Sequence, residues 1–201
     1  MINSKKELVF FIQADRMMNM GCFQLSFKQR VQYMLGMFPV LKWMTIMRKS
    51  NYYDSTYKGL IALYYNSRFQ RLSMKLGFSI GKDVFGYGLV IPHWGTIVVG
   101  PNNKIGNYAV LHTSTCISDN GKMIGDGLYL ATGAKMTSKV VLGDNVTVGA
   151  NSVVNKSFPD GNIMIAGSPA KYIKDAEAWY DRDGLKRRVE KIEALKKKML
   201  Q

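Results

Sequence analysis

The sequence predicts a mainly β fold in which a three-sided coil of short strands lies between an N-terminal helical region and a C-terminal helix. Three observations support this prediction. Aliphatic residues recur every six positions in the middle of the chain, small residues follow most of them, and both flanks space their apolar residues at three and four. Neither a helix nor a pleated strand has a period of six. We place the boundaries at residues 1–77, 78–170 and 171–201.

The N-terminal region, residues 1–77, is predicted to be helical. Stretches 6–18 and 57–77 carry apolar residues at helical intervals, and Pro39 is expected to interrupt a helix. Methionines and aromatic residues are dense there, which is typical of packing in a core or an interface. The alternative is an amphipathic surface that contacts a membrane.

The middle segment, residues 78–170, contains ten units of the repeat. Each six-residue side is predicted to be a short strand with one aliphatic side chain pointing into a narrow axial core, and a small residue at the corner lets the backbone turn. Three sides make one coil, and stacked coils bury a continuous core. The single seven-residue step, within ISDNGKMIG, predicts an extra residue at a corner. The aliphatic positions are Val99, Ile105, Leu111, Ile117, Ile124, Leu130, Met136, Leu142, Val148 and Val154.

The C-terminal segment, GLKRRVEKIEALKKKMLQ, is predicted to form an amphipathic helix with one short apolar stripe. We expect this stripe to dock on the coil or on a neighbouring subunit. Its residues are Leu185, Val189, Ile192, Leu195 and Met199.

The net charge of +14 is concentrated in the flanks, with +9 in residues 1–77, +1 in 78–170 and +4 in 171–201. Solvated helix faces explain such an excess, and so does attraction to an anionic membrane surface or an anionic substrate. A high isoelectric point also fits nucleic-acid binding. Because the basic residues form no recognisable reading motif, we expect no nucleic-acid partner.

The expected location is the cytoplasm. Cys22 and Cys116 are far apart and form no disulfide pattern, which fits a reducing compartment. The apolar stretch LVFFI is too short for a signal peptide, and no window is long enough to span a membrane. If the basic helices contact a membrane, the protein lies at its inner face.

Three stretches of the sequence resemble the hexapeptide-repeat acyltransferases, specifically the serine acetyltransferases and the related capsular and exopolysaccharide O-acetyltransferases. They are IGKDVFGYGLVIPHWGTIVVGPNNKIGNYAVLH, IGDGLYLATGAKM with VVLGDNVTVGANSVV, and the exit AGSPAKYI, and together they cover about residues 78–174. The resemblance implies a left-handed parallel β-helix, a homotrimer, and acetyl-CoA as the acyl donor.

His93 matches the general-base histidine of this family, just before GTIVVG. A neutral hydroxyl must lose its proton as it attacks a thioester, and an imidazole titrates near neutral pH. The repeat register also puts His93 on a local excursion from the coil. His112 matches a histidine that the polysaccharide O-acetyltransferases carry, and Trp94 could stack on a sugar ring. Both are candidates for the acceptor site.

The departures from the serine acetyltransferase pattern favour a sugar or a cell-surface glycan as acceptor. Pro92 stands where an aspartate holds the amino group of serine, and Asn120 and Gly121 replace an Arg-His pair that grips its carboxylate. Only Lys122 nearby is positive, and Asn120 is a further acceptor-site candidate. The alternative is a serine O-acetyltransferase of cysteine biosynthesis. What orients His93 is left open.

The resemblance also implies a donor site, because in this family CoA lies along a groove between coils and contacts small residues at successive corners, where the pantetheine arm passes close to the backbone. Lys174 and Lys139 are additional candidates for contact with the CoA phosphates. The cofactor-binding candidates are Thr132, Gly133, Ala150, Ala166, Gly167, Pro169 and Lys171.

Two other classes are less consistent with the sequence. A zinc carbonic anhydrase needs three histidines at its metal, whereas the chain has two, so we expect no metal. The other class is a non-enzymatic scaffold or membrane adaptor. His93→Ala distinguishes it from an enzyme, because the substitution should abolish the activity of an enzyme but leave the function of a scaffold unchanged.

Overall fold

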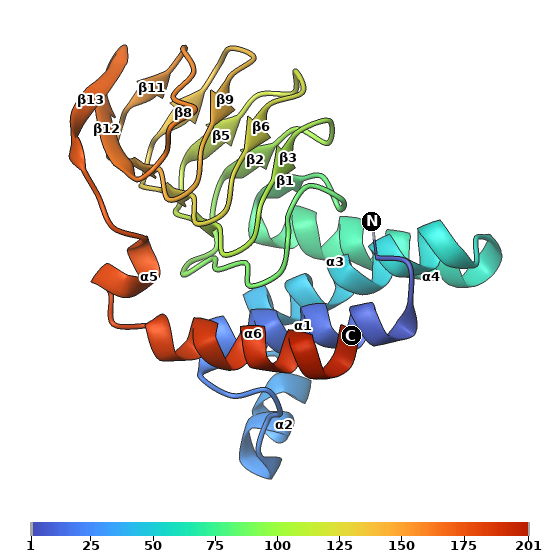
Figure 1. Ribbon diagram of the computed structural model, residues 1–201. Coiled ribbons are helices and arrows are strands. Elements are labelled where there is room, and N and C mark those ends of the chain that lie inside the picture. The colour runs from blue at the N-terminus through green and yellow to red at the C-terminus, as the bar shows by residue number, and fades with distance from the viewer. Residues whose placement is uncertain (1, 201) are drawn as a thin grey trace.

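The computed structural model describes residues 2–200, and it confirms the predicted fold class: a parallel β-solenoid with helices at both ends of the chain (Figure 1). The turns of the solenoid contribute short strands to three sheets, which we call A, B and C, and some sides of the first and last turns pair only through isolated bridges. Sheet A contains β1 (Phe78–Ile80), β2 (Ile97–Val99), β5 (Thr115–Ile117), β8 (Lys135–Met136) and β11 (Val153–Val154). Sheet B contains β3 (Lys104–Ile105), β6 (Met123–Ile124) and β9 (Val141–Leu142). Sheet C contains β4 (Val110–Leu111), β7 (Tyr129–Leu130), β10 (Thr147–Val148), β12 (Ile163–Gly167) and β13 (Ala170–Asp175).

The register of the strands confirms the six-residue repeat and its single insertion. Strand β2 pairs with β5 so that Ile97 faces Thr115, which is three six-residue sides further along the chain. Strand β3 pairs with β6 so that Lys104 faces Met123, one residue further because the seven-residue step lies between them. The insertion therefore lengthens one corner without disturbing the coils above and below it.

The ten aliphatic residues of the repeat all lie in the axial core, at 6% exposure or less. One side chain from each side points inward, so the core is a stack of layers. This stack continues into the helical region, where Trp43, Met47 and Phe69 join the same cluster. The solenoid and its N-terminal helices are consequently stabilised by one continuous apolar interior.

Four helices precede the solenoid: α1 (Lys5–Met20), α2 (Phe27–Met34), α3 (Pro39–Thr56) and α4 (Gly59–Leu76). Ser4 and Ser26 begin α1 and α2 with capping boxes, and Pro39 occupies the first turn of α3. The proline therefore begins a helix here. The structure confirms the predicted helical region, and Gly77, in the left-handed conformation, ends α4 directly before β1.

A buried ion pair connects α1, α3 and the first coil. The carboxylate of Asp15 accepts from Arg48 Nε at 2.9 Å and Nη2 at 3.2 Å, and both side chains are 2% exposed. Arg48 also donates to the carbonyls of Phe85 and Gly86, and the Leu89 N–H donates to Asp15 at 3.0 Å. The helices are thereby attached to the backbone that leads into the His93 loop.

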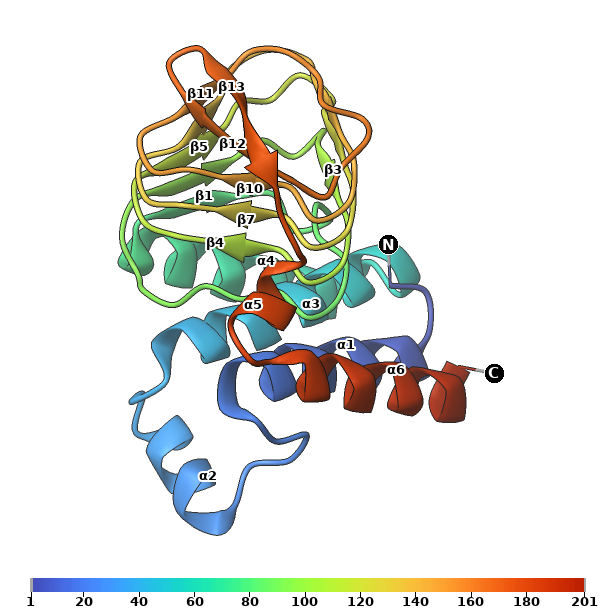
Figure 2. The same ribbon diagram turned by 60° about the vertical axis from the view of Figure 1, so that its left-hand side comes forward.

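The C-terminal segment turns back onto the first coils. Strand β13 pairs antiparallel with β12, so the sheet continues past residue 170, and α5 (Trp179–Arg182) and α6 (Lys186–Leu200) follow. Helix α6 lies alongside α1 (Figure 2). Its Glu193 accepts from the hydroxyls of Tyr87, at 2.8 Å, and Tyr108. The predicted docking of this helix on the coil is confirmed, and α1 forms the rest of its contact surface.

No helix within residues 2–200 is long and apolar enough to cross a membrane.

Candidate active site

One edge of the solenoid carries most of the predicted site residues. At this edge, which we call the His93 edge, each strand of sheet C leads into the next strand of sheet A. The strand register places one corner directly above another, because Leu111 faces Leu130, Leu130 faces Val148, and Val148 faces Ile165. In chain order, these corners contain His93, His112, Thr132 and Ala150, and Gly167 follows on the same edge in the turn from β12 to β13.

His93 is exposed in the corner loop between Val90 and β2, residues 91–96, in which Ile91 is buried in the axial core. Val90 bridges to Val110 of the next coil, and the Gly95 N–H donates to Leu76 at 3.0 Å, so both ends of the loop are fixed. Within residues 2–200, no side chain hydrogen bonds to the His93 imidazole. His93 is exposed, and no side chain in the described part of the chain orients its ring through a hydrogen bond.

His112 lies one coil above His93 and is half-buried. Its ring centroid is 5.1 Å from that of Tyr129. Burial lowers the pKa of His112, and the charge of His93 lowers it further, while Asp183 acts in the opposite direction. The two imidazoles are thus close enough to interact, and His112 is predominantly neutral at neutral pH.

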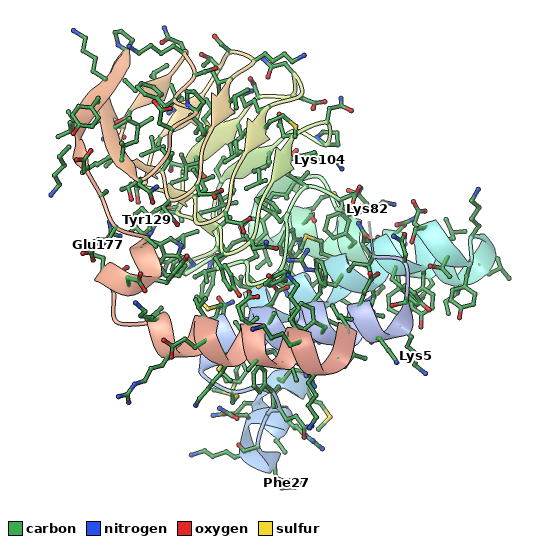
Figure 3. All side chains as sticks on the ribbon, viewed as in Figure 1. Lys5, Phe27, Lys82, Lys104, Tyr129 and Glu177 are labelled. Carbon is green, nitrogen blue, oxygen red and sulfur yellow. The ribbon has the colours of Figure 1, made fainter. Side chains whose placement is uncertain are left out.

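Three residues beside His112 were not among the sequence candidates. Arg182 lies over the ring of Tyr129, with its Cζ 4.7 Å from the ring centroid, and its Nε donates to Asp183 at 2.9 Å. Tyr129 lies close to α5 (Figure 3), because β13 and α5 fold back along sheet C. Tyr129 was detectable as the outward-facing neighbour of Leu130 in the repeat, whereas Arg182 and Asp183 come from a short helix with no periodic signal.

The predicted donor residues continue the same edge beyond His112. Thr132 and Ala150 are exposed, whereas Gly133 is buried and has a φ of +75°. A Cβ on Gly133 would overlap the Asn151 side-chain oxygen. These corners need small residues because the stacked backbones approach closely, and the result is a low surface on which a flexible substrate arm could lie against the backbone.

The turn between β12 and β13 closes the far end of this edge. Gly167 and Pro169 are exposed there, and Ala166 is half-buried. Lys171 and Lys174 extend from β13 into solvent, and Lys174 also lines a pocket of about 280 Å³ with Arg182. Lys171 thus lies beside the turn, whereas Lys174 pairs with Met164 at the other end of the hairpin, and Asp175 and Glu177 line the same pocket. Contact of these lysines with CoA phosphates stays a prediction.

Two candidates lie elsewhere in the chain. Asn120 and Lys139 follow strands of sheet A and occupy the edge that leads into sheet B. The Asn120 amide donates to the Thr137 carbonyl at 3.2 Å. Within one chain, Asn120 is thus separated from His93, because the residues between them include a complete side of the coil. Asn120 could therefore join His93 in an acceptor site only across two subunits, and its role in the acceptor site stays a prediction.

Lys122 is enclosed within the inserted corner. Its ammonium donates to the Ser118 carbonyl at 2.7 Å, the Ser118 hydroxyl at 2.9 Å and Asn120 Oδ1 at 2.5 Å. Burial lowers the pKa of Lys122. These bonds hold the inserted loop together, and the ammonium is already engaged, so it is poorly placed to bind a substrate carboxylate.

Trp94 borders a separate apolar pocket of about 340 Å³ beside the His93 loop. Its side chain is 62% exposed. The pocket is also lined by Pro92, by Met18 and Met20 at the end of α1, and by Met37 before α3, and it has no charged lining residue. The side of the loop that faces the helices is therefore suited to an apolar or uncharged group.

No group of three or more His, Cys, Asp or Glu side chains within residues 2–200 is arranged to hold a metal ion.

No family model matches the chain. In sequence, it is 29% identical over 140 residues to a serine acetyltransferase of Staphylococcus aureus strain Mu50, an alignment covering 66% of this chain and 63% of the relative. It is 32% identical over 95 residues to a serine acetyltransferase of Helicobacter pylori strain 26695, covering 44% and 55%. The chain therefore spans less than two thirds of the length of these relatives.

Solved structures show the same fold. The serine acetyltransferase of Neisseria gonorrhoeae has a TM-score of 0.60 at 21% identity, covering 88% of this chain and 69% of that one. A soybean serine acetyltransferase in complex with serine has a TM-score of 0.61 at 19% identity, covering 83% and 68%. A serine acetyltransferase in complex with CoA has a TM-score of 0.58 at 20% identity, covering 83% and 67%. The resemblance to hexapeptide-repeat acyltransferases of the serine acetyltransferase branch is confirmed in sequence and in fold.

Proposed function

We propose that this chain, which resembles the serine acetyltransferases in both sequence and fold, is an O-acetyltransferase that takes its acetyl group from acetyl-CoA. One observation carries the proposal: an exposed histidine begins an edge of the solenoid whose next corner contains His112 and whose further corners are small, stacked and followed by Lys171. A hydroxyl substrate needs a base, and a long flexible donor needs a low, extended surface that ends in positive charge. The His93 edge offers these features in that order.

His93 acts as the general base in this proposal. The acceptor oxygen attacks the carbonyl carbon of the thioester while the imidazole takes the hydroxyl proton. The C–S bond then breaks, and the imidazolium returns that proton to the departing thiolate. His112, which burial keeps neutral, contributes an uncharged ring beside the base and lets His93 carry the transient positive charge.

L-serine is the acceptor that the relatives favour, and this ranks it above the sugar that the sequence alone favoured. The relatives aligned in sequence are named serine acetyltransferases, and one structural neighbour was solved with serine bound. Any serine site here must differ from the expected pattern, since Pro92 precedes the base and Lys122 is engaged inside its own loop.

A sugar or glycan hydroxyl is the second candidate acceptor. Trp94 is largely exposed beside His93, and the adjoining pocket has no charged lining residue. A neutral polyol needs hydrogen bonds and stacking and no matched ionic partners. This candidate rests on the residues of the chain, whereas the serine candidate rests on its relatives.

A homotrimer is part of the proposal. The His93 imidazole lacks an orienting side chain within residues 2–200, and a neighbouring subunit placed against the His93 edge would supply one. Asn120, on a different edge of the solenoid, could then reach the acceptor from that neighbour. Sedimentation equilibrium tests this directly: a trimeric mass supports the shared site, and a monomer removes it. A cytoplasmic location and the absence of a nucleic-acid partner remain predictions.

The enzymatic test is release of free CoA from acetyl-CoA by the purified chain, with L-serine or a panel of sugars and glycan fragments as acceptor. His93→Ala is expected to lower turnover about 10²–10⁴-fold with the true acceptor. Asn155→Ala, at an exposed corner of another edge, serves as the matched control and retains activity. If His93→Ala and the wild type released CoA equally, the proposed role of His93 would be wrong.

A further inference from the structure

Helix α2 projects from the body of the molecule (Figures 1 and 2). None of its side chains is buried. Phe27, Val31 and Met34 share one face of the helix and are 84%, 36% and 70% exposed. Phe27 lies at the end of the molecule furthest from the solenoid (Figure 3). Adjacent exposed apolar side chains of this size indicate an interaction surface.

All charged side chains in the stretch that contains this helix are basic. Between Asp15 and Asp54 the sequence contains no aspartate or glutamate and six lysine and arginine residues, of which only Arg48 is buried and paired with a carboxylate, that of Asp15. Lys28 and Arg30 lie on α2 itself, on either side of the apolar face. An apolar face bordered by cations is typical of helices that lie in the interface of an anionic membrane.

A cavity of about 550 Å³ lies between α1 and α2, and its polar lining consists of Gln13, Arg16, Gln24, Arg30 and Tyr33. No acidic residue lines it. Arg16 Nε and Gln13 Oε1 are buried and have no hydrogen-bond partner within residues 2–200. Arg30 donates only through its Nε, to the Leu25 carbonyl at 3.1 Å, which leaves its terminal nitrogens available. Two guanidinium groups without a carboxylate form a receptive site for a phosphate.

We propose that α2 and this cavity dock the protein on an anionic phospholipid bilayer. The apolar face of α2 enters the boundary between headgroups and acyl chains, and Arg16 and Arg30 hold a lipid phosphate. Met37 follows α2 and lines the pocket that Pro92 and Trp94 border, so the docking surface is continuous with the His93 loop. The docking itself does not rest on the proposed acetyl transfer.

Charge favours a membrane over a second copy of the chain. A second α2 would bring another set of cations against the first, with no carboxylate between residues 15 and 54 to neutralise them. Binding of free phosphate alone would use Arg16 and Arg30 and would leave the apolar face unexplained. A lipid headgroup with its acyl chains matches both features.

The test is co-sedimentation of the full chain with vesicles of phosphatidylcholine alone, or of an equal mixture of phosphatidylcholine and phosphatidylglycerol. We expect binding to the anionic vesicles only, and weaker binding as salt is added. Arg16→Gln with Arg30→Gln should lower the partition coefficient about 30-fold. Phe27→Ser with Met34→Ser should lower it about tenfold or more.

Matched controls come from α4, where Leu60 and Leu63 are 86% and 65% exposed and Arg71 and Lys75 are exposed cations. Leu60→Ser with Leu63→Ser, and Arg71→Gln with Lys75→Gln, should retain binding. Equal binding to neutral vesicles, or an equal loss in the α4 controls, would overturn the proposal.

Two further outcomes would assign the surface differently. If inorganic phosphate raised the melting temperature of the wild type but not of the double arginine variant, and no vesicles were bound, the ligand would be a soluble phosphate. If no vesicles were bound and Phe27→Ser with Met34→Ser converted an oligomer to a smaller species, the occupant would be a second copy.

Discussion

Asp15→Ala removes the acidic partner from the buried ion pair that joins α1, α3 and the first coil. In the wild type, Asp15 accepts two hydrogen bonds from Arg48 and one from the Leu89 N–H. After the substitution, the guanidinium keeps the Phe85 and Gly86 carbonyls but has no counter-charge, and its side chain is 2% exposed. The Leu89 N–H also loses its acceptor.

We expect this change to lower the free energy of unfolding by about 4 kcal/mol. Breaking a buried ion pair from one side costs about 3–5 kcal/mol, because the remaining charge cannot be solvated. The unpaired N–H adds about 1–3 kcal/mol, and the two retained carbonyl contacts offset part of the total. In a protein of this size, about 4 kcal/mol corresponds to a fall of about 8–16 °C in melting temperature.

The assay is urea unfolding followed by the fluorescence of Trp43 and Trp179, which are both buried. Asp15→Ala, Arg48→Met and the double variant form a double-mutant cycle. The double variant should be more stable than Asp15→Ala alone, because it contains no uncompensated buried charge. A loss below about 1 kcal/mol in Asp15→Ala would refute this reasoning. So would a double variant no more stable than Asp15→Ala.

Three further predictions concern the site and the C-terminal helix. Burial lowers the pKa of His112, so the unfolded chain binds more protons than the folded chain just below about pH 6.5. The free energy of unfolding should therefore fall as the pH is lowered through this range. NMR titration of His112 and urea midpoints at several pH values check this, and His112→Gln should make the stability less dependent on pH. Gly133→Ala should cost more stability than Gly184→Ala, because both positions have positive φ but only Gly133 would collide with Asn151; thermal unfolding of the two variants measures the difference. Glu193→Gln weakens two hydrogen bonds that Glu193 accepts from tyrosine hydroxyls. The variant should be cleaved faster than the wild type in α6 during limited proteolysis, while the melting temperature of the solenoid stays unchanged. Equal cleavage rates in the variant and the wild type would contradict this prediction.

The coil was predictable because its signal is periodic and local. Each aliphatic residue of the repeat occupies an equivalent position, so a wrong assignment of the core position in one unit would disagree with the six-residue spacing of the next unit. Val99 and Leu142 are buried for the same reason, although they lie in different sheets. The insertion was visible as one seven-residue step, and it became the corner that encloses Lys122.

The repeat also predicts which edge of the solenoid Asn120 occupies. Sides follow one another in the order A, B, C, so corners of the same edge recur only after a complete coil. His112 and Asn120 are eight residues apart, which puts one full side between them. Counting sides from His112 therefore places Asn120 on the neighbouring edge, where the structure has it.

The six-residue repeat does not predict how the helices pack or which side chains surround His112. The pairing of Asp15 with Arg48 joins helices whose relative orientation no periodicity encodes. The position of Arg182 over Tyr129 depends on the hairpin of β12 and β13, which redirects the chain along sheet C. Both contacts are set by tertiary packing between segments far apart in sequence.

The aligned corners divide the His93 edge into equal steps, one for each coil. Neighbouring strands in a sheet are about 4.8 Å apart, so the corner of His93 and that of Gly167, four coils further on, are separated by about 19 Å. The edge works as a ruler whose unit is one coil of backbone. Adding or removing a coil would change the span in whole steps of about 5 Å, whereas a side-chain substitution leaves the spacing of the coils unchanged.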